Sequence, residues 1–240
     1  MAERPLRVPV SGLRPGAIAL PAEASHYVGV VHRLGPGEPL VLVDHGARLE
    51  APARVVSSAR GALVVEAGEP VASPRLPPFD VVLLQGLPKG DKMDSVVRDA
   101  TELGVARVVP VLAARSVGRP APGRLERWRR VALEAARQSG RGDLPALAEP
   151  VAAERAWALA PAAGPRLVLE PGAPPFAEAL GAGRPASVAL AVGPEGGWAP
   201  SELAGAQTEG WALASLGPFV MRTETAAAAA LGALWALARA

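Results

Sequence analysis

The sequence contains no cysteine among its 240 residues, which excludes disulfide bonds, thiolate-ligated zinc, iron–sulfur clusters and thiol nucleophiles. It has three histidines, and none has a cluster of carboxylates beside it, so no metal site is expected. No uninterrupted apolar run approaches the about 20 residues that span a bilayer, and the first residues lack the apolar segment of a signal peptide. We therefore expect a cytoplasmic protein that binds neither a metal nor a membrane.

Lysine is also scarce, since Lys89 and Lys92 are the only two among 25 basic residues. The net charge is +2, yet residues 73–145 hold thirteen basic against eight acidic side chains, and residues 115–141 hold eight arginines and two glutamates. Guanidinium groups pair bidentately with phosphate oxygens, so this segment suits nucleic-acid contact. A general preference for arginine would scatter it over any surface, and the two lysines would equally suit a solvated loop, so both alternatives stay open.

The first 72 residues are β-rich, because short apolar runs alternate with glycine and aspartate turns, a pattern typical of a small barrel. The expected strands are residues 7–10, 17–20, 40–43, 51–56 and 63–65, with one helix over residues 22–34. Residues 69–78 contain four prolines, which sustain neither a helix nor a sheet ladder. We therefore expect a first domain over residues 1–72, a linker over 73–78 and a second domain over 79–240.

Apolar strands alternate with helices in the second domain, which predicts an α/β fold with a largely parallel sheet. The expected strands are residues 79–84, 108–112, 167–169, 187–192 and 211–216, and the expected helices are 92–103, 125–138 and a last one from near Glu224 to Arg239. Asp91 is expected to cap the first of these helices. The last helix is apolar on nearly every face, which predicts that it is buried.

Two glycine-containing loops follow strands of this domain and give its strongest functional signal. The first, residues 193–197, reads Gly-Pro-Glu-Gly-Gly, and the second begins with Gly217-Pro218. Ligand loops lie at the carboxyl ends of parallel strands, and glycine lets backbone N–H groups approach a bound molecule closely. Neither loop matches G-x-G-x-x-G or G-x-x-x-x-G-K-[ST], so a phosphate cradle is disfavoured.

The two loops lie in segments that resemble a known family. Residues 192–198 (VGPEGGW) and 216–226 (LGPFVMRTETA) are similar to the C-terminal signature of the RsmE-type 16S rRNA uridine N3-methyltransferases, members of the SPOUT class of S-adenosylmethionine enzymes. Further segments follow the family's order and spacing: 87–94 (LPKGDKMD), 100–104 (ATELG), 115–117 (RSV) and 138–141 (QSGR). His32 and Arg137 depart from the pattern, which usually has leucine and glutamate at these positions.

The resemblance implies a SPOUT-type deep trefoil-knot domain after an N-terminal PUA-like β-barrel that binds RNA. It also implies a homodimer that uses S-adenosyl-L-methionine to methylate N3 of one uridine in the 16S rRNA of the small ribosomal subunit. The residues expected to hold the cofactor are Leu169, Val192, Gly193, Pro194, Gly197, Leu216, Gly217, Val220, Met221, Thr225 and Ala226. Those expected to contact RNA are Arg33, Lys89, Lys92, Arg115, Arg119 and Arg141.

Methylation at N3 of uridine needs removal of the imide proton and stabilisation of the negative charge that results. Arg222 is expected to contact the uracil carbonyls or a flanking phosphate, and Glu224 to act as the base or to orient a neighbouring donor. Glu195 is held in reserve as the base. The alternative is structural: Glu224 caps its own helix and pairs with Arg222.

Two other functions fit parts of the sequence. A methyltransferase of the same fold could act on a ribose 2′-hydroxyl or a tRNA base. A non-enzymatic RNA-binding module would explain the barrel and the basic middle third, but it would not need the glycine loops.

Overall fold

The computed structural model describes residues 5–59, 62–119 and 121–238, which form two compact units. The first unit comprises Met1–Leu76 and Ala136–Leu144, and the second comprises Pro77–Ala135 and Pro145–Ala240. The division falls inside the proline-rich segment. Residues 136–144, which the sequence pattern assigns to the second domain, belong instead with the first unit.

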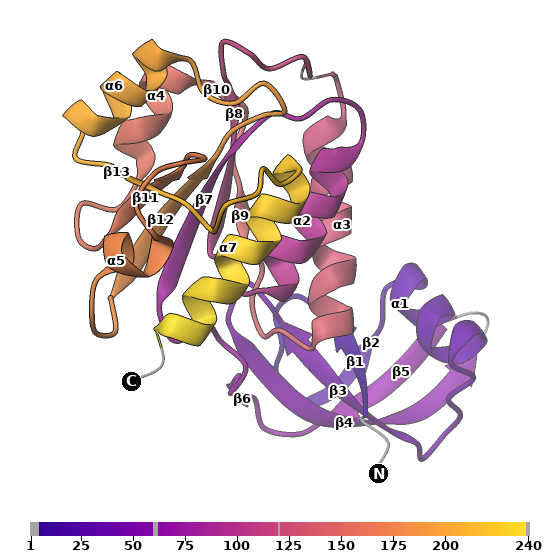
Figure 1. The fold of residues 1–240 in the computed structure, drawn as a ribbon. Coiled ribbons are helices and arrows are strands. Elements are labelled where there is room, and N and C mark those ends of the chain that lie inside the picture. Colours follow the sequence, from indigo (N-terminus) through magenta and orange to yellow (C-terminus); the bar gives the residue numbers. More distant parts are fainter. Residues whose placement is uncertain (1–4, 60–61, 120, 239–240) are drawn as a thin grey trace. The chain divides into compact units, whose positions relative to one another are not determined.

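The N-terminal unit is a mixed sheet (Figure 1). Its strands are β1 (Leu6–Pro9), β2 (Gly16–Ala19), β3 (Pro39–Asp44), β4 (Leu49–Ala59), β5 (Ala62–Ala67) and β6 (Val71–Ala72). The order is β1-β3-β4-β5-β2, with β6 paired to β4, and only β1 and β3 run parallel. Among the described strands β1 and β2 end this path and are not paired with each other, so the ladder of the expected barrel is open there.

The helix expected over residues 22–34 is shorter than predicted. Helix α1 (Ala22–His26) continues into a π-helical turn (Tyr27–Val31), in which the N–H of His32 donates to the carbonyl of Tyr27 at 3.0 Å. Arg33 then adopts φ 56°, a left-handed conformation that ends the helix. The spacing of apolar residues does not predict a π-helical turn or a left-handed residue, because both are local backbone conformations.

The second unit is built on a parallel sheet in the order β10-β8-β7-β12-β11-β13, with β9 paired to β8. The strands are β7 (Asp80–Gly86), β8 (Arg107–Leu112), β9 (Ala146–Leu147), β10 (Val151–Ala152), β11 (Arg166–Leu169), β12 (Ser187–Val192) and β13 (Ala212–Ala214). At its centre β7 and β12 pair from Asp80 with Ser187 to Gln85 with Val192. Both strands are buried along nearly their whole length, which explains their continuous apolar sequences.

Helices cover both faces of this sheet (Figure 1). One core packs the sheet against α2 (Lys92–Glu102), α3 (Arg124–Ser139), α5 (Phe176–Leu180) and α7 (Thr223–Leu237); the other packs it against α4 (Ala153–Ala156), the turn Trp157–Leu159 and α6 (Pro200–Thr208). The α/β class with a parallel sheet is confirmed. The expected Asp91 cap is wrong, because that carboxylate makes no cap hydrogen bond and instead accepts one from Arg124 at 2.8 Å.

The last helix, α7, is buried on one face only. Ala227, Leu231 and Leu234 pack into the core, whereas Gly232 and Leu237 are exposed. The expectation of a helix buried all round is therefore wrong for this chain taken singly, because a helix packed on one side leaves its opposite face uncovered even when that face is apolar. Within the described residues no helix has the length and apolar character needed to cross a membrane.

Candidate functional site

A cavity of about 370 Å³ opens at the carboxyl ends of β11 and β12, beside the start of α7. Its walls are Leu169, Glu170, Pro171, Val192, Gly193, Pro194, Glu195, Gly197, Trp198, Ala214, Ser215, Leu216, Gly217, Phe219, Val220, Met221, Arg222, Thr223 and Ala226. All residues predicted to hold the cofactor belong to this wall except Thr225. Three segments that are far apart in the sequence thus form one concave surface, of a size usual for small-molecule sites.

Thr225 is exposed and lies outside the cavity, and Thr223 takes the place expected for it. The reason is helical geometry: α7 begins at Thr223, so Thr223 and Ala226 share a face while Thr225 points away. The motif predicted a segment that lines the cavity, but which way each side chain faces depends on the residue at which the helix begins.

The 193–197 loop is held by charged neighbours. The Glu195 carboxylate accepts a hydrogen bond from Lys92 Nζ at 2.8 Å and from the backbone N–H of Lys89 at 3.2 Å. Burial raises the pKa of Glu195, but these hydrogen bonds outweigh it, so the net pKa lies below the ordinary value. A carboxylate kept ionised in this way is a weak proton acceptor, which argues against Glu195 as the reserve base.

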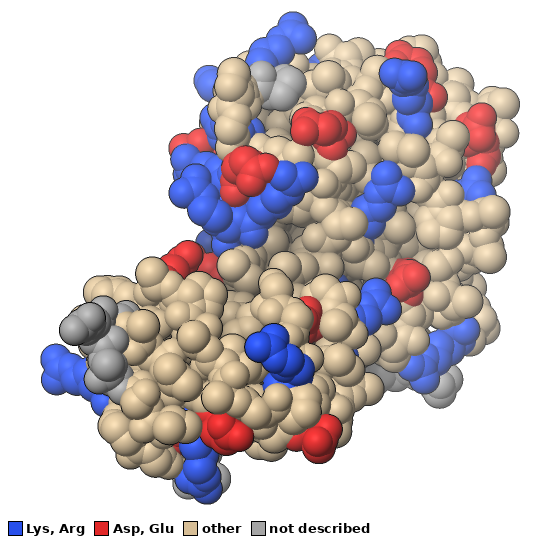
Figure 2. Space-filling model, turned by 180° about the vertical axis from the view of Figure 1, so that it is seen from behind, with Lys and Arg blue, Asp and Glu red and all other residues tan. Residues whose placement is uncertain are grey.

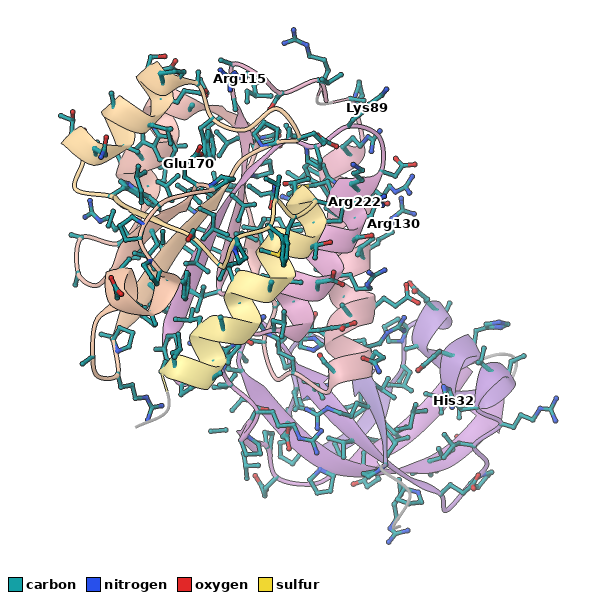
Figure 3. All side chains as sticks on the ribbon, viewed as in Figure 1. His32, Lys89, Arg115, Arg130, Glu170 and Arg222 are labelled. Atoms are coloured by element: carbon teal, nitrogen blue, oxygen red, sulfur yellow. The ribbon has the colours of Figure 1, made fainter. Side chains whose placement is uncertain are left out.

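Glu224 lies on the other side of Lys92. Its Oε2 is 3.9 Å from Lys92 Nζ and is buried without a hydrogen-bond partner among the described residues. The helix has no side-chain cap, and no ion pair joins Arg222 to Glu224 in the described part of the chain, so the structural alternative for this pair is not observed. Arg222 is exposed at the mouth of the cavity (Figure 3).

Glu170 is a wall residue that begins a loop, residues 170–175, which the resemblance places beside the cofactor, but it was not among the residues expected to hold the cofactor. It follows β11 directly, and its carboxylate has no hydrogen bond or ion pair within the described chain. Burial raises the pKa of Glu170, and the positive charge of Arg115 opposes this shift only in part. Its position at the carboxyl end of a buried parallel strand was the available signal. Other wall residues outside the expected cofactor set are Pro171, Trp198, Ala214, Ser215, Phe219 and Thr223.

The comparisons with known proteins agree with this geometry. A model of the RNA methyltransferase domain family matches residues 75–235. The ribosomal RNA small subunit methyltransferase E of Mycobacterium bovis is 37% identical over 231 residues, covering 92% of this chain and 87% of that protein. The enzyme of the same name from Synechocystis is 33% identical, covering 92% and 73%. This chain belongs to the small subunit methyltransferase E family.

Solved structures of the family share the whole fold. The methyltransferase E of Neisseria gonorrhoeae, bound to S-adenosyl methionine, is 27% identical and superposes with a TM-score of 0.88 over 98% of each chain. A putative methyltransferase from Legionella pneumophila, in complex with the same cofactor, is 30% identical, with a TM-score of 0.85 over 98% of each chain. The SPOUT-like α/β fold is thereby confirmed, and the threading of the last helix through a knot stays a prediction.

The basic residues predicted to bind RNA in this methyltransferase E member have different surroundings. Arg115 donates from Nη1 to the carbonyl oxygens of Gly196 at 3.1 Å and Trp198 at 3.3 Å, so it braces the 193–197 loop. Arg141 is only 6% exposed, and its Nε donates to Asp143 at 2.6 Å. Its guanidinium is thus engaged inside the protein, and we withdraw it as an RNA contact.

Basic side chains of α3 form ion pairs with acidic side chains at the start of α2. Figure 2 shows acidic side chains set among the basic ones on the face of the molecule it presents. Arg124 pairs with Asp91 at 2.8 Å and Arg127 with Asp94 at 2.5 Å. Arg130 is exposed and has no ion pair within the described residues (Figure 3). The eight arginines of residues 115–141 therefore offer fewer free guanidinium groups than their number suggests.

The described residues contain no group of three or more His, Asp or Glu side chains placed to hold a metal ion.

Proposed function

We propose that the protein transfers a methyl group from S-adenosyl-L-methionine to N3 of a uridine in small-subunit ribosomal RNA. The observation that carries this proposal is the cavity at the ends of β11 and β12, in a chain that shares its fold over 98% of its length with a methyltransferase E bound to S-adenosyl methionine. The finer assignment to N3 of uridine rests on the sequence motifs that surround the cavity.

The cavity suits this cofactor by its chemistry. Main-chain groups of Gly193, Gly197 and Gly217 and apolar walls favour adenine and ribose over a triphosphate. Glu170 adds an unpaired carboxylate, which favours a cation over an anion. When bound, the cofactor supplies a methyl carbon bonded to a positively charged sulfur; the N3–C bond forms as the C–S bond breaks, and the imide proton goes to a base.

Arg222 and Glu224 are the residues we assign to the uracil. Arg222 is exposed at the cavity mouth without an internal partner among the described residues, so it is free to hold a uracil carbonyl or a flanking phosphate. Glu224 has a buried carboxylate oxygen without a hydrogen bond, and it is the candidate base. Because base pairing occupies N3 inside a stem, the uridine must enter single-stranded or splayed out.

The RNA contacts we propose are Arg33, Lys89 and Arg119, all of them exposed, with Arg130 added from the structure. Lys92 and Arg115 remain close enough to the mouth to be considered, but their main contacts brace the 193–197 loop. Because the substrate is a ribosomal subunit, we place the activity in the cytoplasm.

We also propose a homodimer through the uncovered face of α7. Gly232, Ala236 and Leu237 are exposed there, and small residues allow two backbones to approach closely. A two-fold interface here would be isologous, because the same face of α7 would contribute from both subunits.

The test is incubation with methyl-labelled S-adenosylmethionine and small ribosomal subunits, followed by digestion and identification of the labelled nucleoside. We expect label in N3-methyluridine of the rRNA and, in a parallel titration, stoichiometric binding of S-adenosylhomocysteine. Label in a 2′-O-methyl nucleoside or in tRNA would replace the proposal with a methyltransferase of other specificity. Absence of both label and binding would leave the non-enzymatic RNA-binding module.

A further inference from the structure

A fully buried amide lies at the carboxyl end of the central strand β7. Gln85 is 0% exposed, in a strand whose preceding residues Val81, Leu83 and Leu84 are all apolar and buried. Burying an amide among such residues costs free energy unless its groups are hydrogen-bonded, and its Oε1 has no partner among the described residues. An apolar residue of the same shape would avoid that cost, so the packing of β7 does not explain the glutamine.

The Gln85 side chain is tied to two acceptors through its Nε2. One hydrogen bond goes to the backbone oxygen of Gly86 at 3.0 Å, and the other goes to Oγ1 of Thr223 at 2.8 Å. The opposite orientation of the amide would turn its oxygen toward the Gly86 oxygen, so the contacts fix which end is nitrogen.

The Thr223 hydroxyl can donate its proton in only one direction. It accepts from Gln85, and it lies 2.6 Å from the backbone oxygen of Gly193, which can only accept. The hydroxyl therefore donates to Gly193, the first residue of the 193–197 loop. Three elements around the cavity are joined through one oxygen atom: the end of β7, the end of β12 and the first residue of α7.

We propose that Gln85 and Thr223 are positioning residues for methyl transfer. The hydrogen bonds from Gln85 to Thr223 and from Thr223 to the Gly193 carbonyl hold the 193–197 loop and the start of α7 in fixed positions relative to each other. The residues flanking Thr223 are Arg222 and Glu224, the two we assign to the uracil, so the chain couples the place of the cofactor to the place of the target base. This inference rests on the proposed function.

The test compares variants at Thr223 that differ in one group. Thr223→Val keeps the shape and removes the hydroxyl, whereas Thr223→Ser keeps the hydroxyl and removes the methyl group. We expect Thr223→Val to bind S-adenosylhomocysteine about 10-fold more weakly, because restoring the loop to its binding position would cost about the free energy of one buried hydrogen bond, and about 1.4 kcal/mol is a factor of ten in affinity. Thr223→Ser should remain within about 3-fold of the wild type.

Kinetics separate positioning from general loss of stability. For Thr223→Val we expect a raised KM for the cofactor and a lowered kcat, with the KM for small subunits unchanged. Gln85→Met should shift the same parameters, and the double variant should be no worse than Thr223→Val, because Gln85 acts through the hydroxyl. Gln85→Met also keeps the test informative should Thr223→Val fail to fold.

Four results would overturn the inference. Wild-type affinity in Thr223→Val would remove the hydroxyl from cofactor binding, and equal losses in Thr223→Ser and Thr223→Val would assign the effect to packing. Additive losses in the double variant would make the two residues independent. A wild-type protein that binds no S-adenosylhomocysteine would overturn the proposed function itself, and this inference with it.

Discussion

The proton acceptor can be tested at the single residue Glu224. Since this side chain makes no cap hydrogen bond, Glu224→Gln should leave the melting temperature nearly unchanged. Loss of a general base should lower turnover by about 10²-fold or more. The measurement is kcat for subunit methylation beside a thermal melt, with Glu209→Gln, an exposed carboxylate in another part of the unit, as the control. Intact turnover together with a lowered melting temperature would assign Glu224 a structural role.

Glu170 should make the folded protein less stable as pH rises, whereas most carboxylates make it less stable as pH falls. Its folded pKa is raised above the ordinary value of 4.5, mainly by burial, so the stability it contributes is complete below that value and is lost as pH rises through the folded pKa. Glu170→Gln should therefore raise the melting temperature at pH 7 and change it little near pH 4. The same variant should bind S-adenosylmethionine more weakly, because the cation loses a carboxylate partner.

The check is a set of thermal melts across pH together with calorimetric titration of both proteins. Glu178→Gln, on α5 in the same unit, is the matched control. An equal gain in melting temperature at both pH values would exclude ionisation of Glu170 as the cause.

At the scale of elements, the end of β7 and the 193–197 loop are in such close contact that a methyl group added between them should push them apart. A Cβ added at Gly86 would lie 2.5 Å from Pro194 Cδ and 2.6 Å from Pro194 N. Because backbone must move to relieve this overlap, Gly86→Ala should displace the loop and weaken S-adenosylhomocysteine binding by about 10-fold or more, a cost of about 1–3 kcal/mol.

The matched control is Gly205→Ala in α6, where the new Cβ would meet Trp157 Nε1 at an ordinary 3.7 Å. This change should leave binding unaltered and stabilise the helix by about 0.5–1 kcal/mol. Calorimetric titration and thermal melts of both variants decide the matter. Unchanged affinity in Gly86→Ala would show that the loop accommodates the methyl group without moving the ligand site.

The glycine loops and all strands except the two-residue β6, β9 and β10 could be predicted from the sequence, because their signals are local: continuous apolar runs, and glycines at their carboxyl ends. Other elements lack such signals. Helix α6 is short and rich in alanine and glycine, and α4 is a single turn, so neither shows an apolar period. Arg141 was predicted to contact phosphate because its burial, which holds its guanidinium inside the protein beside Asp143, is set by tertiary packing. The facing of Thr223 depended on a helix start that the sequence placed one residue late.

At the scale of the whole molecule, the uncovered face of α7 should decide the assembly state. Leu237 is 47% exposed in the single chain, whereas Leu231 and Leu234 are fully buried within it. Aspartate at the two buried positions would unfold the chain and report nothing on assembly. Leu237→Asp should instead convert a dimer to a monomer while the melting temperature stays within a few degrees, as followed by sedimentation at micromolar concentration.

Val30→Asp, at an exposed apolar site in the N-terminal unit, serves as the control and should leave the mass unchanged. A wild-type monomer at this concentration would contradict the dimer. A dimer that survives Leu237→Asp would move the interface away from this end of α7.

The pairing of β7 with β12 has a consequence for synthesis on the ribosome. Asp80 lies opposite Ser187, so the central strand of the second unit is made about a hundred residues before its neighbour. Until then β7 has only β8 beside it, and its other edge, an apolar strand with unpaired N–H and C=O groups, stays open in the nascent chain. Contacts of such long sequence separation form slowly. The site of an enzyme that acts on the small ribosomal subunit would therefore stay unassembled during its own synthesis. It could form only after about the last fifty residues have emerged from the translating ribosome.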